Sequence, residues 1–298
     1  MFLPNDMYPS RTGADEQVIP RKDPAIYNNP SLSENPLAQS ALDFYADNGF
    51  LVLPDYLPEQ VSPLLAEIEA LKKTMAGEEA LVTEPGSREV RTIFKPFQYS
   101  DVIRNFFRDP KILNVARQLL GSDVYMMQSR VNIKPAYTGR SFAWHSDFET
   151  WHVEDGMPRM RAVTAWIMLT ENHEHNGPLY VIPGSHKLYV SCAGQTEAEN
   201  YKTSLKTQKL GVPQPDTMNE ILATRDIKAI TGKPGTVVFH ECNILHGSPD
   251  NISNDPRTIL MCVYNSVLNK PVAPFGGLEP RPDFLSNRDQ RAISSLVV

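Results

Sequence analysis

The sequence predicts an α+β protein that is mainly β, with a double-stranded β-helix, or jelly roll, flanked by helices. Two observations lead to this fold class. The longer helical apolar patterns all lie before Gly121, and from Val124 onward the apolar runs are short, rich in β-branched residues and separated by Gly, Pro and Asn. Helices followed by many strands indicate an α+β protein, and a cupin-like double sheet is the architecture that closes such strands around a core.

The first 121 residues are expected to hold an irregular arm, three helices and two short strands. Residues 1–37 are polar and rich in Pro and Asn, which predicts an arm that is draped on the domain or partly disordered. Helices are expected at 38–48, at 58–75 and from the Asp109-Pro110 cap to Gly121. Strands are expected at 50–53 and 90–94.

The rest of the chain is expected to form the sheets. The predicted strands are 124–134, 162–170, 178–182, 236–240 and 258–265. Residues 187–234 form a polar excursion, too broken for core strands, with short helices expected around 197–206 and 217–223. Insertions of that length are usually lids or oligomer contacts. A single domain over 38–298 that carries this insertion is therefore expected.

The overall composition excludes several classes of protein. The net charge is −6 and hydrophobic residues make up 41%, which is ordinary for a globular protein and gives no footprint for nucleic acid. No apolar run approaches the ~20 residues of a membrane span, and the N-terminus lacks the order of a signal peptide. The three cysteines are expected to be free thiols in a reducing cytoplasm. No membrane partner is expected for the protein.

His145 and Asp147 are separated by one residue, which places an imidazole and a carboxylate on the same side of an extended backbone. His246 is the candidate third ligand. Two histidines and one carboxylate hold non-haem Fe(II) and leave positions open for a chelating co-substrate and O2. A hydrogen-bonded pair in a loop is the plain alternative for a lone His-x-Asp, but the His-x10-Arg spacing from His246 to Arg257 favours the metal site.

Arg257 stands at the start of an apolar strand, where it would lie at the mouth of the barrel. A guanidinium gives two parallel donors to one carboxylate, so this position suits a dicarboxylate co-substrate. A surface salt bridge is the alternative.

The other five histidines have plainer interpretations. Their positions are His152, His173, His175, His186 and His240. The pair at 173 and 175 lies in a polar turn and is expected to be solvated, and His186 is expected to be structural. His152 is expected behind the ligand pair or at the surface. For His240, an inward position beside the metal is weighed against its charged neighbour Glu241.

These motifs resemble a known family. The likeness lies in residues 7–10, 47–50, 91–94, 128–134, 142–152, 176–179, 183–186, 201–202, 204–206, 273–277 and 279–282. The spacing of His145, Asp147, His246 and Arg257 is typical of the Fe(II)/2-oxoglutarate dioxygenases of the phytanoyl-CoA hydroxylase superfamily. The run Trp-His-Ser-Asp-Phe-Glu-Thr-Trp-His at 144–152 is more specific, and it resembles the ectoine hydroxylases.

The resemblance implies a jelly-roll dioxygenase domain, a homodimer and the conversion of ectoine to 5-hydroxyectoine, with release of succinate and CO2. It also implies residue roles. The iron ligands would be His145, Asp147 and His246. The contacts of 2-oxoglutarate would be Lys134 and Arg257, with Asn132 and Phe94 nearby. The residues around ectoine would be Gln128, Thr150, Trp151 and Arg281.

Those residue types suit a small zwitterion, a cyclic amidinium that bears a carboxylate. Trp151 offers an aromatic face to the cation, and Arg281 can pair with the carboxylate. Gln128 either hydrogen-bonds the ring nitrogens or is an ordinary polar strand residue. Tyr264 is either a second aromatic wall or a core residue.

The chain departs from the family pattern at His240 and Glu241, where Phe and Asp are more usual. This exchange alters the expected wall of the substrate pocket and leaves the metal ligands intact. Asp147 argues against a halogenase of the same fold, because those enzymes have a small residue there. Two alternatives stay open: a sibling hydroxylase of another small amino acid such as proline, and a non-catalytic jelly-roll protein with structural Zn(II).

Overall fold

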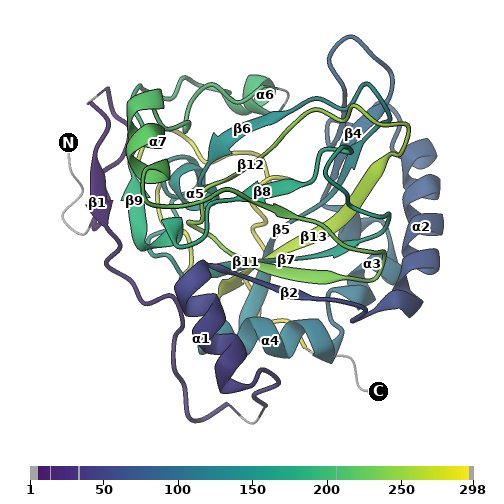
Figure 1. Ribbon diagram of the computed structural model, residues 1–298, viewed down its shortest axis with the longest axis horizontal. Coiled ribbons are helices and arrows are strands. Elements are labelled where there is room, and N and C mark those ends of the chain that lie inside the picture. Colours follow the sequence, from purple (N-terminus) through teal and green to yellow (C-terminus); the bar gives the residue numbers. More distant parts are fainter. Residues whose placement is uncertain (1–5, 14, 33, 206, 295–298) are drawn as a thin grey trace.

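Two antiparallel sheets form the centre of the molecule in this computed structural model, which describes residues 6–13, 15–32, 34–205 and 207–294 (Figure 1). The large sheet has the order β2 (Phe50–Leu53), β11 (Val237–Glu241), β7 (Ala162–Met168), β13 (Arg257–Ser266), β5 (Val124–Lys134), β4 (Val90–Phe94) and β3 (Leu81–Thr83). The small sheet has the order β10 (Lys228–Ile230), β8 (Leu179–Val181), β12 (His246–Ser248) and β6 (Phe142–His145).

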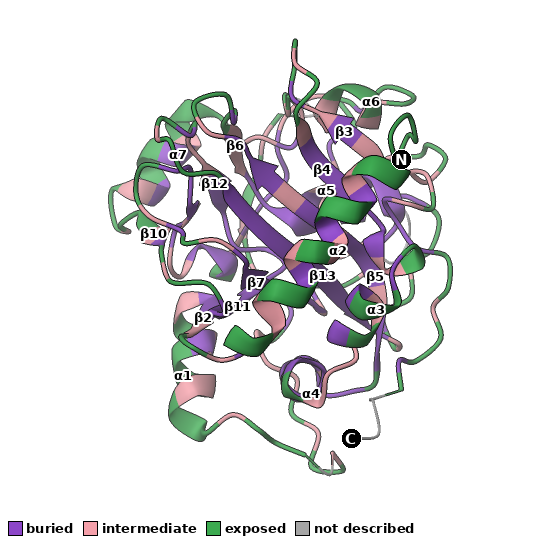
Figure 2. Ribbon diagram, turned by 90° about the vertical axis from the view of Figure 1, so that its right-hand side faces the viewer, coloured by how far each residue is buried: buried purple, intermediate pink, exposed green. Residues whose placement is uncertain are grey.

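Helices cover the outer face of the large sheet. These are α1 (Gln39–Asn48), α2 (Val61–Thr74), α3 (Asp101–Phe106) and α4 (Pro110–Leu120). Helix α4 packs on β7, β13 and β5. The helices expose their outward faces while the strands behind them are buried (Figure 2).

Strand β13 shows how the alternation of side chains separates two apolar cores. Leu260, Cys262 and Tyr264 point to the helices, where they join the main core with residues of α2 and α4. Ile259 and Met261 point the other way, into an apolar cluster between the two sheets. Arg257 is an even number of residues away from Ile259 and Met261 on the same strand, so its side chain also faces the interior of the roll.

The N-terminal arm lies against the roll. Strand β1 (Val18–Pro20) pairs with β9 (Leu188–Val190), and Tyr8 is completely buried. Arg11 is also buried, and it forms ion pairs with Glu149 at 2.8 Å and with Glu154 at 2.7 Å. The described part of the arm is thus draped on the domain, which is one of the two expected arrangements.

The predicted helices and long strands are confirmed to within a few residues, but two expectations are wrong in part. The backbone is extended only as far as Ser146, because Asp147 begins helix α5 (Asp147–Asp155). The excursion contributes β10 to the small sheet, so it is not only an insertion. Its short helices are α6 (Tyr201–Ser204) and α7 (Pro215–Leu222), and Lys206 lies outside the described residues.

Two global findings are simpler. Among the described helices, none is both long enough and apolar enough to cross a membrane. The three cysteines are free and buried.

Candidate active site

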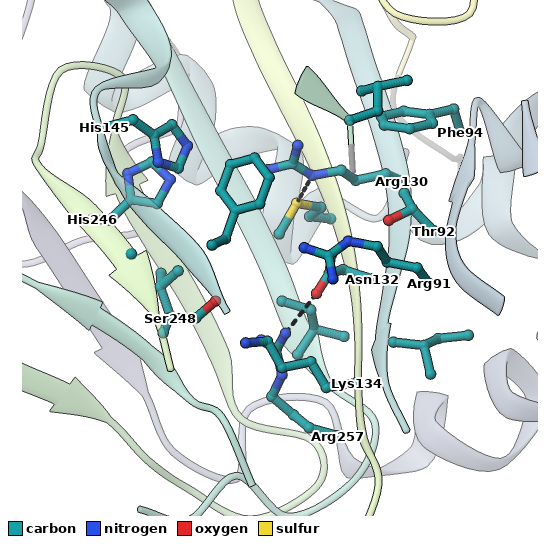
Figure 3. Close-up of a pocket in the computed structure, with 17 residues that line it drawn as sticks. Arg91, Thr92, Phe94, Arg130, Asn132, Lys134, His145, His246, Ser248 and Arg257 are labelled. Carbon is teal, nitrogen blue, oxygen red and sulfur yellow. Dashed lines mark hydrogen bonds between the residues drawn. The ribbon is translucent and has the colours of Figure 1, made fainter. Parts of the chain in front are cut away.

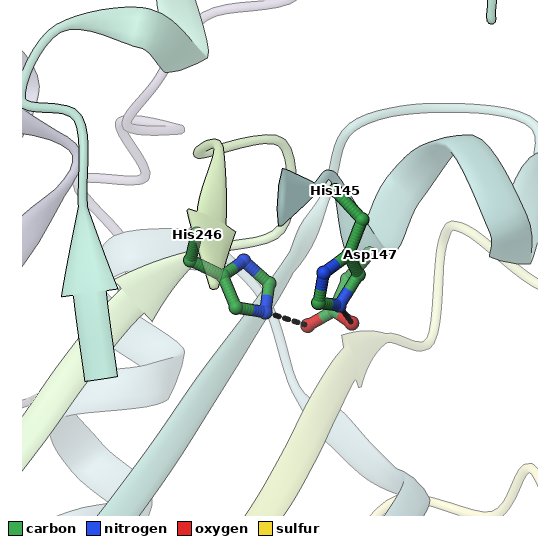
Figure 4. Close-up of side chains that lie close together, drawn as sticks. All are labelled: His145, Asp147 and His246. Carbon is green, nitrogen blue, oxygen red and sulfur yellow. Dashed lines mark ion pairs between the residues drawn. The ribbon is translucent and has the colours of Figure 1, made fainter. Parts of the chain in front are cut away.

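His145, Asp147 and His246 converge at one end of the roll (Figure 4). Strands β6 and β12 are antiparallel neighbours, and His145 is the register partner of His246. Asp147 lies two residues past the end of β6, in the first turn of α5. The cap of that helix, Ser146, donates to Asn243 at 2.9 Å. One donor atom from each of the three residues lies within 4.8 Å of the others, so the sheet pairing brings distant histidines to a single point.

The hydrogen bonds fix the tautomers of the two histidines. His145 Nδ1 lies 2.8 Å from the carbonyl oxygen of Ala143, and His246 Nδ1 lies 3.0 Å from that of Ile244. A carbonyl only accepts, so each Nδ1 carries a proton, and in the neutral ring Nε2 is left with a free lone pair. These Nε2 atoms lie 3.7 and 3.9 Å from oxygens of Asp147. Such backbone bonds orient metal-ligating histidines.

The charge states also suit a cation. Burial, together with the nearby His145, lowers the pKa of His246 well below its usual value, so its imidazole is neutral. Burial alone would raise the pKa of Asp147, but His246, His145, His240 and Arg130 outweigh it and lower that pKa. Two imidazoles and a carboxylate, all buried, are a donor set that fits Fe(II).

Side chains of strand β5 line part of a cavity beside the metal ligands (Figure 3). Because strand side chains alternate, every second residue from 128 to 134 faces the interior. These residues are Gln128, Arg130, Asn132 and Lys134. The predicted contacts Lys134, Asn132, Phe94 and Arg257 all line this cavity together with His145 and His246.

The described residues that line this cavity include several basic side chains and no carboxylate. Four cations line it: Arg91, Arg130, Lys134 and Arg257. Within the described part of the chain, only Arg91 of these four has a carboxylate partner, because Glu84 accepts from it at 2.9 Å. Arg257 donates to the Asn132 side chain at 2.5 Å, and its buried Nε has no hydrogen-bond partner among the residues that the structure describes.

Burial perturbs the two predicted anion contacts. Burial, with the nearby Arg257 adding to it, lowers the pKa of Lys134 to about 6. Its Nζ donates to the carbonyl of Pro249. Burial and the neighbouring guanidinium groups lower the pKa of Arg257 to about 9. A buried ammonium without an anionic partner is unfavourable, so both side chains would gain from a bound anion.

The predicted substrate residues line a second cavity on the other side of the metal ligands. Gln128, Thr150, Trp151 and Arg281 line it, and Asp147 contributes to the same wall. Positions 147, 150, 151 and 154 have the spacing of one helix face, so α5 presents the metal carboxylate and the substrate wall together. Phe94, Arg130, Phe142 and His145 line both cavities, which places the triad at the boundary between them.

Two of these side chains are held in fixed orientations. Gln128 donates its Nε2 to the carbonyl of Leu285 at 2.7 Å, which leaves its Oε1 as a free acceptor. Arg281 donates to both carboxylate oxygens of Asp155, at 3.0 and 2.5 Å. The guanidinium of Arg281 is therefore already paired on one edge, and no pattern in the sequence predicts this contact.

The open alternatives are resolved as follows. Tyr264 belongs to the core, where its hydroxyl donates to the carbonyl of Phe107 at 2.7 Å. His152 is buried between Phe148 and Phe275, and His186 is buried with a 3.0 Å contact to the carbonyl of Ala46. His240 does point inward, with Nε2 3.6 Å from Asp147.

Arg130 was missed by the sequence argument. It lies between two predicted residues of the same face, so the alternation that places Gln128 and Asn132 in the interior also predicts it. Helix α5 was missed as well, although Ser146 and Glu149 have the spacing of a capping box.

The jelly roll and the histidine–carboxylate triad define a non-haem metal site with open positions. The chain belongs to the phytanoyl-CoA dioxygenase (PhyH) family, whose model matches residues 45–259.

Within this family the chain is similar to ectoine dioxygenases. It is 45% identical to that of Bordetella bronchiseptica, over 95% of this chain and 92% of the relative. It is also 45% identical to that of Sphingopyxis alaskensis, over 96% of this chain and 94% of the relative. The structure of EctD from S. alaskensis with 2-oxoglutarate and 5-hydroxyectoine matches with a TM-score of 0.85 and 41% identity, covering 96% of each chain. EctD with bound Fe matches with a TM-score of 0.86. The predicted fold class is confirmed by this likeness.

Proposed function

We propose that this protein is an Fe(II)- and 2-oxoglutarate-dependent dioxygenase that hydroxylates ectoine to 5-hydroxyectoine. One observation carries the proposal: a buried two-histidine, one-carboxylate triad lies between a carboxylate-free cationic cavity and a second cavity with an aromatic wall. The near full-length likeness to ectoine dioxygenases supports the substrate.

His145, Asp147 and His246 would hold the iron through two Nε2 atoms and a carboxylate oxygen. When bound, Fe(II) would supply the activation of O2 with 2-oxoglutarate as co-substrate. A ligand set of two imidazoles and one carboxylate suits this chemistry because it leaves coordination positions open. The overall reaction consumes 2-oxoglutarate, O2 and ectoine, and it yields succinate, CO2 and 5-hydroxyectoine.

The cationic cavity binds 2-oxoglutarate. Arg257 and Lys134 hold the carboxylate that is distant from the metal, because both are buried basic side chains without a carboxylate partner among the described residues, and a bound anion favours the charged form of Lys134. Asn132 holds the guanidinium of Arg257 in place, and Phe94 closes the apolar side. Arg130 lies between this cavity and the substrate side, so it can meet a negative group from either ligand.

The second cavity binds ectoine. Trp151 presents its ring to the amidinium, and the free Oε1 of Gln128 accepts from a ring N–H. Arg281, held by Asp155, pairs with the substrate carboxylate, while Thr150 adds a hydroxyl. Since α5 carries both Trp151 and Asp147, the substrate ring is fixed relative to the metal, which is the orientation that a hydroxylation requires.

The proposal also covers the domain organisation, the cellular compartment and the oligomeric state of the protein. Residues 38–298 would act as a single domain with the arm folded over it. The enzyme would work as a homodimer. It would do so in the cytoplasm, where reducing conditions keep cysteines as the free thiols found here.

A test against the two alternatives uses purified protein with Fe(II), ascorbate and 2-oxoglutarate, and compares ectoine with proline by measuring succinate. The proposal expects ectoine-dependent succinate that disappears in Asp147→Ala. Stimulation by proline alone would favour the sibling hydroxylase. No consumption of 2-oxoglutarate with either compound would favour a metal-binding protein with structural zinc.

A further inference from the structure

His240 is a fourth histidine at the metal ligands. It lies on β11, where its register partner on β7 is Thr164, and it is 1% exposed. Val238, two residues earlier, belongs to the cluster between the sheets, so His240 faces the same interior. Its Nε2 lies 3.6 Å from Oδ2 of Asp147, and its ring centroid lies 5.2 Å from that of His246.

Trp166 fixes the tautomer of His240. The indole Nε1 of Trp166 donates to His240 Nδ1 at 3.1 Å. An indole N–H only donates, so Nδ1 must be an acceptor, and the proton of a neutral ring is on Nε2. This is the opposite tautomer to that of His145 and His246, whose Nδ1 atoms face carbonyls. The N–H of His240 therefore faces the metal carboxylate, whereas the other two histidines offer lone pairs.

The two atoms that face each other are both without a partner. His240 Nε2 and Asp147 Oδ2 are buried side-chain atoms that make no hydrogen bond among the described residues. A buried donor and a buried acceptor are each costly when unpaired. At 3.6 Å they are slightly too far apart for a hydrogen bond, and sites of this kind often tighten when their ligand binds.

We propose that His240 is a positioning residue that donates its Nε2–H to the Asp147 carboxylate when the metal is bound. A carboxylate has two oxygens, so one can ligate the metal while the other accepts from His240. This bond holds the carboxylate plane and limits the rotation of Asp147 about its side-chain torsions. The inference rests on the proposed metal site and deepens it.

The same geometry excludes His240 as a fourth ligand. Its lone pair is on Nδ1, and that atom is engaged by Trp166. Ligation through Nε2 would require the proton to move to Nδ1. Two N–H donors, Nδ1–H and the indole N–H of Trp166, would then face each other. The open coordination positions that 2-oxoglutarate and O2 need therefore stay open.

The experiment compares metal affinity in three proteins by anaerobic titration calorimetry with Mn²⁺ alone: wild type, His240→Phe and His240→Gln. His240→Phe keeps an aromatic ring and removes the donor, so we expect its Mn²⁺ affinity to fall about 10–100-fold, as is usual for partners of metal ligands. His240→Gln keeps an N–H donor and is expected to recover most of that loss. Thermal unfolding of the metal-free proteins separates metal binding from folding.

Each outcome decides a different question. An unchanged affinity in His240→Phe, or a loss that His240→Gln shares in full, would overturn the positioning role. If His240→Phe does not fold, ¹⁵N-histidine NMR of the wild type with Zn²⁺ decides, because a proton on Nδ1 of His240 contradicts the proposal. Wild-type protein that binds no metal at all would instead refute the proposed function.

Discussion

Lys134 makes the binding of 2-oxoglutarate depend on pH. In the free protein its pKa is lowered to about 6, so its amine is mostly neutral at pH 8. A carboxylate beside it favours the ammonium form, so binding must take up a proton. A pH of 8 is about 2 units above the pKa of Lys134, so charging its amine there costs about 2.7 kcal/mol. Half of the amine is charged at pH 6 and about 1% at pH 8, so the affinity for 2-oxoglutarate should fall roughly 50-fold between these pH values, with about one proton taken up at pH 8.

Calorimetry measures both quantities with protein saturated by Mn²⁺, which takes metal binding out of the pH dependence. Titrations with 2-oxoglutarate in buffers of different ionisation enthalpy give the number of protons taken up. Lys134→Arg keeps a cation that stays charged, so we expect its binding to lose both the proton uptake and the steep pH dependence. Lys187→Met is the matched control, because this exposed lysine pairs only with Asp47 among the described residues. A wild-type affinity that is flat from pH 6 to pH 8 would refute the reasoning.

Three further predictions concern other contacts. Arg281→Met removes the proposed partner of the substrate carboxylate, so KM for ectoine should rise roughly 30-fold, or about 2 kcal/mol, while KM for 2-oxoglutarate stays unchanged in a succinate assay. Arg11→Met leaves Glu149 and Glu154 without their arm partner and should destabilise the fold by about 3–5 kcal/mol in urea unfolding. Because the pKa of Glu149 is already raised to about 7 by burial, this loss should be smaller at pH 6 than at pH 8, and an equal loss would contradict the ion-pair argument. Gly121→Ala places a Cβ 2.1 Å from the Tyr27 carbonyl oxygen at φ +59, so it should cost more than about 1 kcal/mol. It should also cost more than Gly77→Ala, where φ is likewise positive at +94 but nothing lies within 4 Å of the added Cβ.

Long apolar patterns made much of this fold predictable from the sequence. The strand at 124–134 and the helix that Gly121 ends are found at the expected bounds, because each buries a full face and has clear end signals. Strand β12 was not predictable by the same means. It has only three residues, His246–Ser248, and it exists because β6 and β8 pair with it on either side.

The candidate site divides in the same way. The spacing of His145, Asp147 and His246 indicates a metal, but spacing says nothing about the carbonyls of Ala143 and Ile244 that set the ring tautomers. Nor can it place the indole of Trp166 against His240, since that contact joins neighbouring strands. The pairing of Arg281 with Asp155 also depends on a fold contact between distant segments.

In the proposed reaction one ferrous ion, held by two imidazoles and one aspartate, couples the oxidation of 2-oxoglutarate to the hydroxylation of ectoine. Mass spectrometry of a reaction run under ¹⁸O2 tests it directly. We expect one labelled oxygen atom in the hydroxylated ectoine and one in succinate, in equal amounts, with neither formed by Asp147→Ala. Hydroxyectoine without label, or succinate released at the same rate with and without ectoine, would contradict the account.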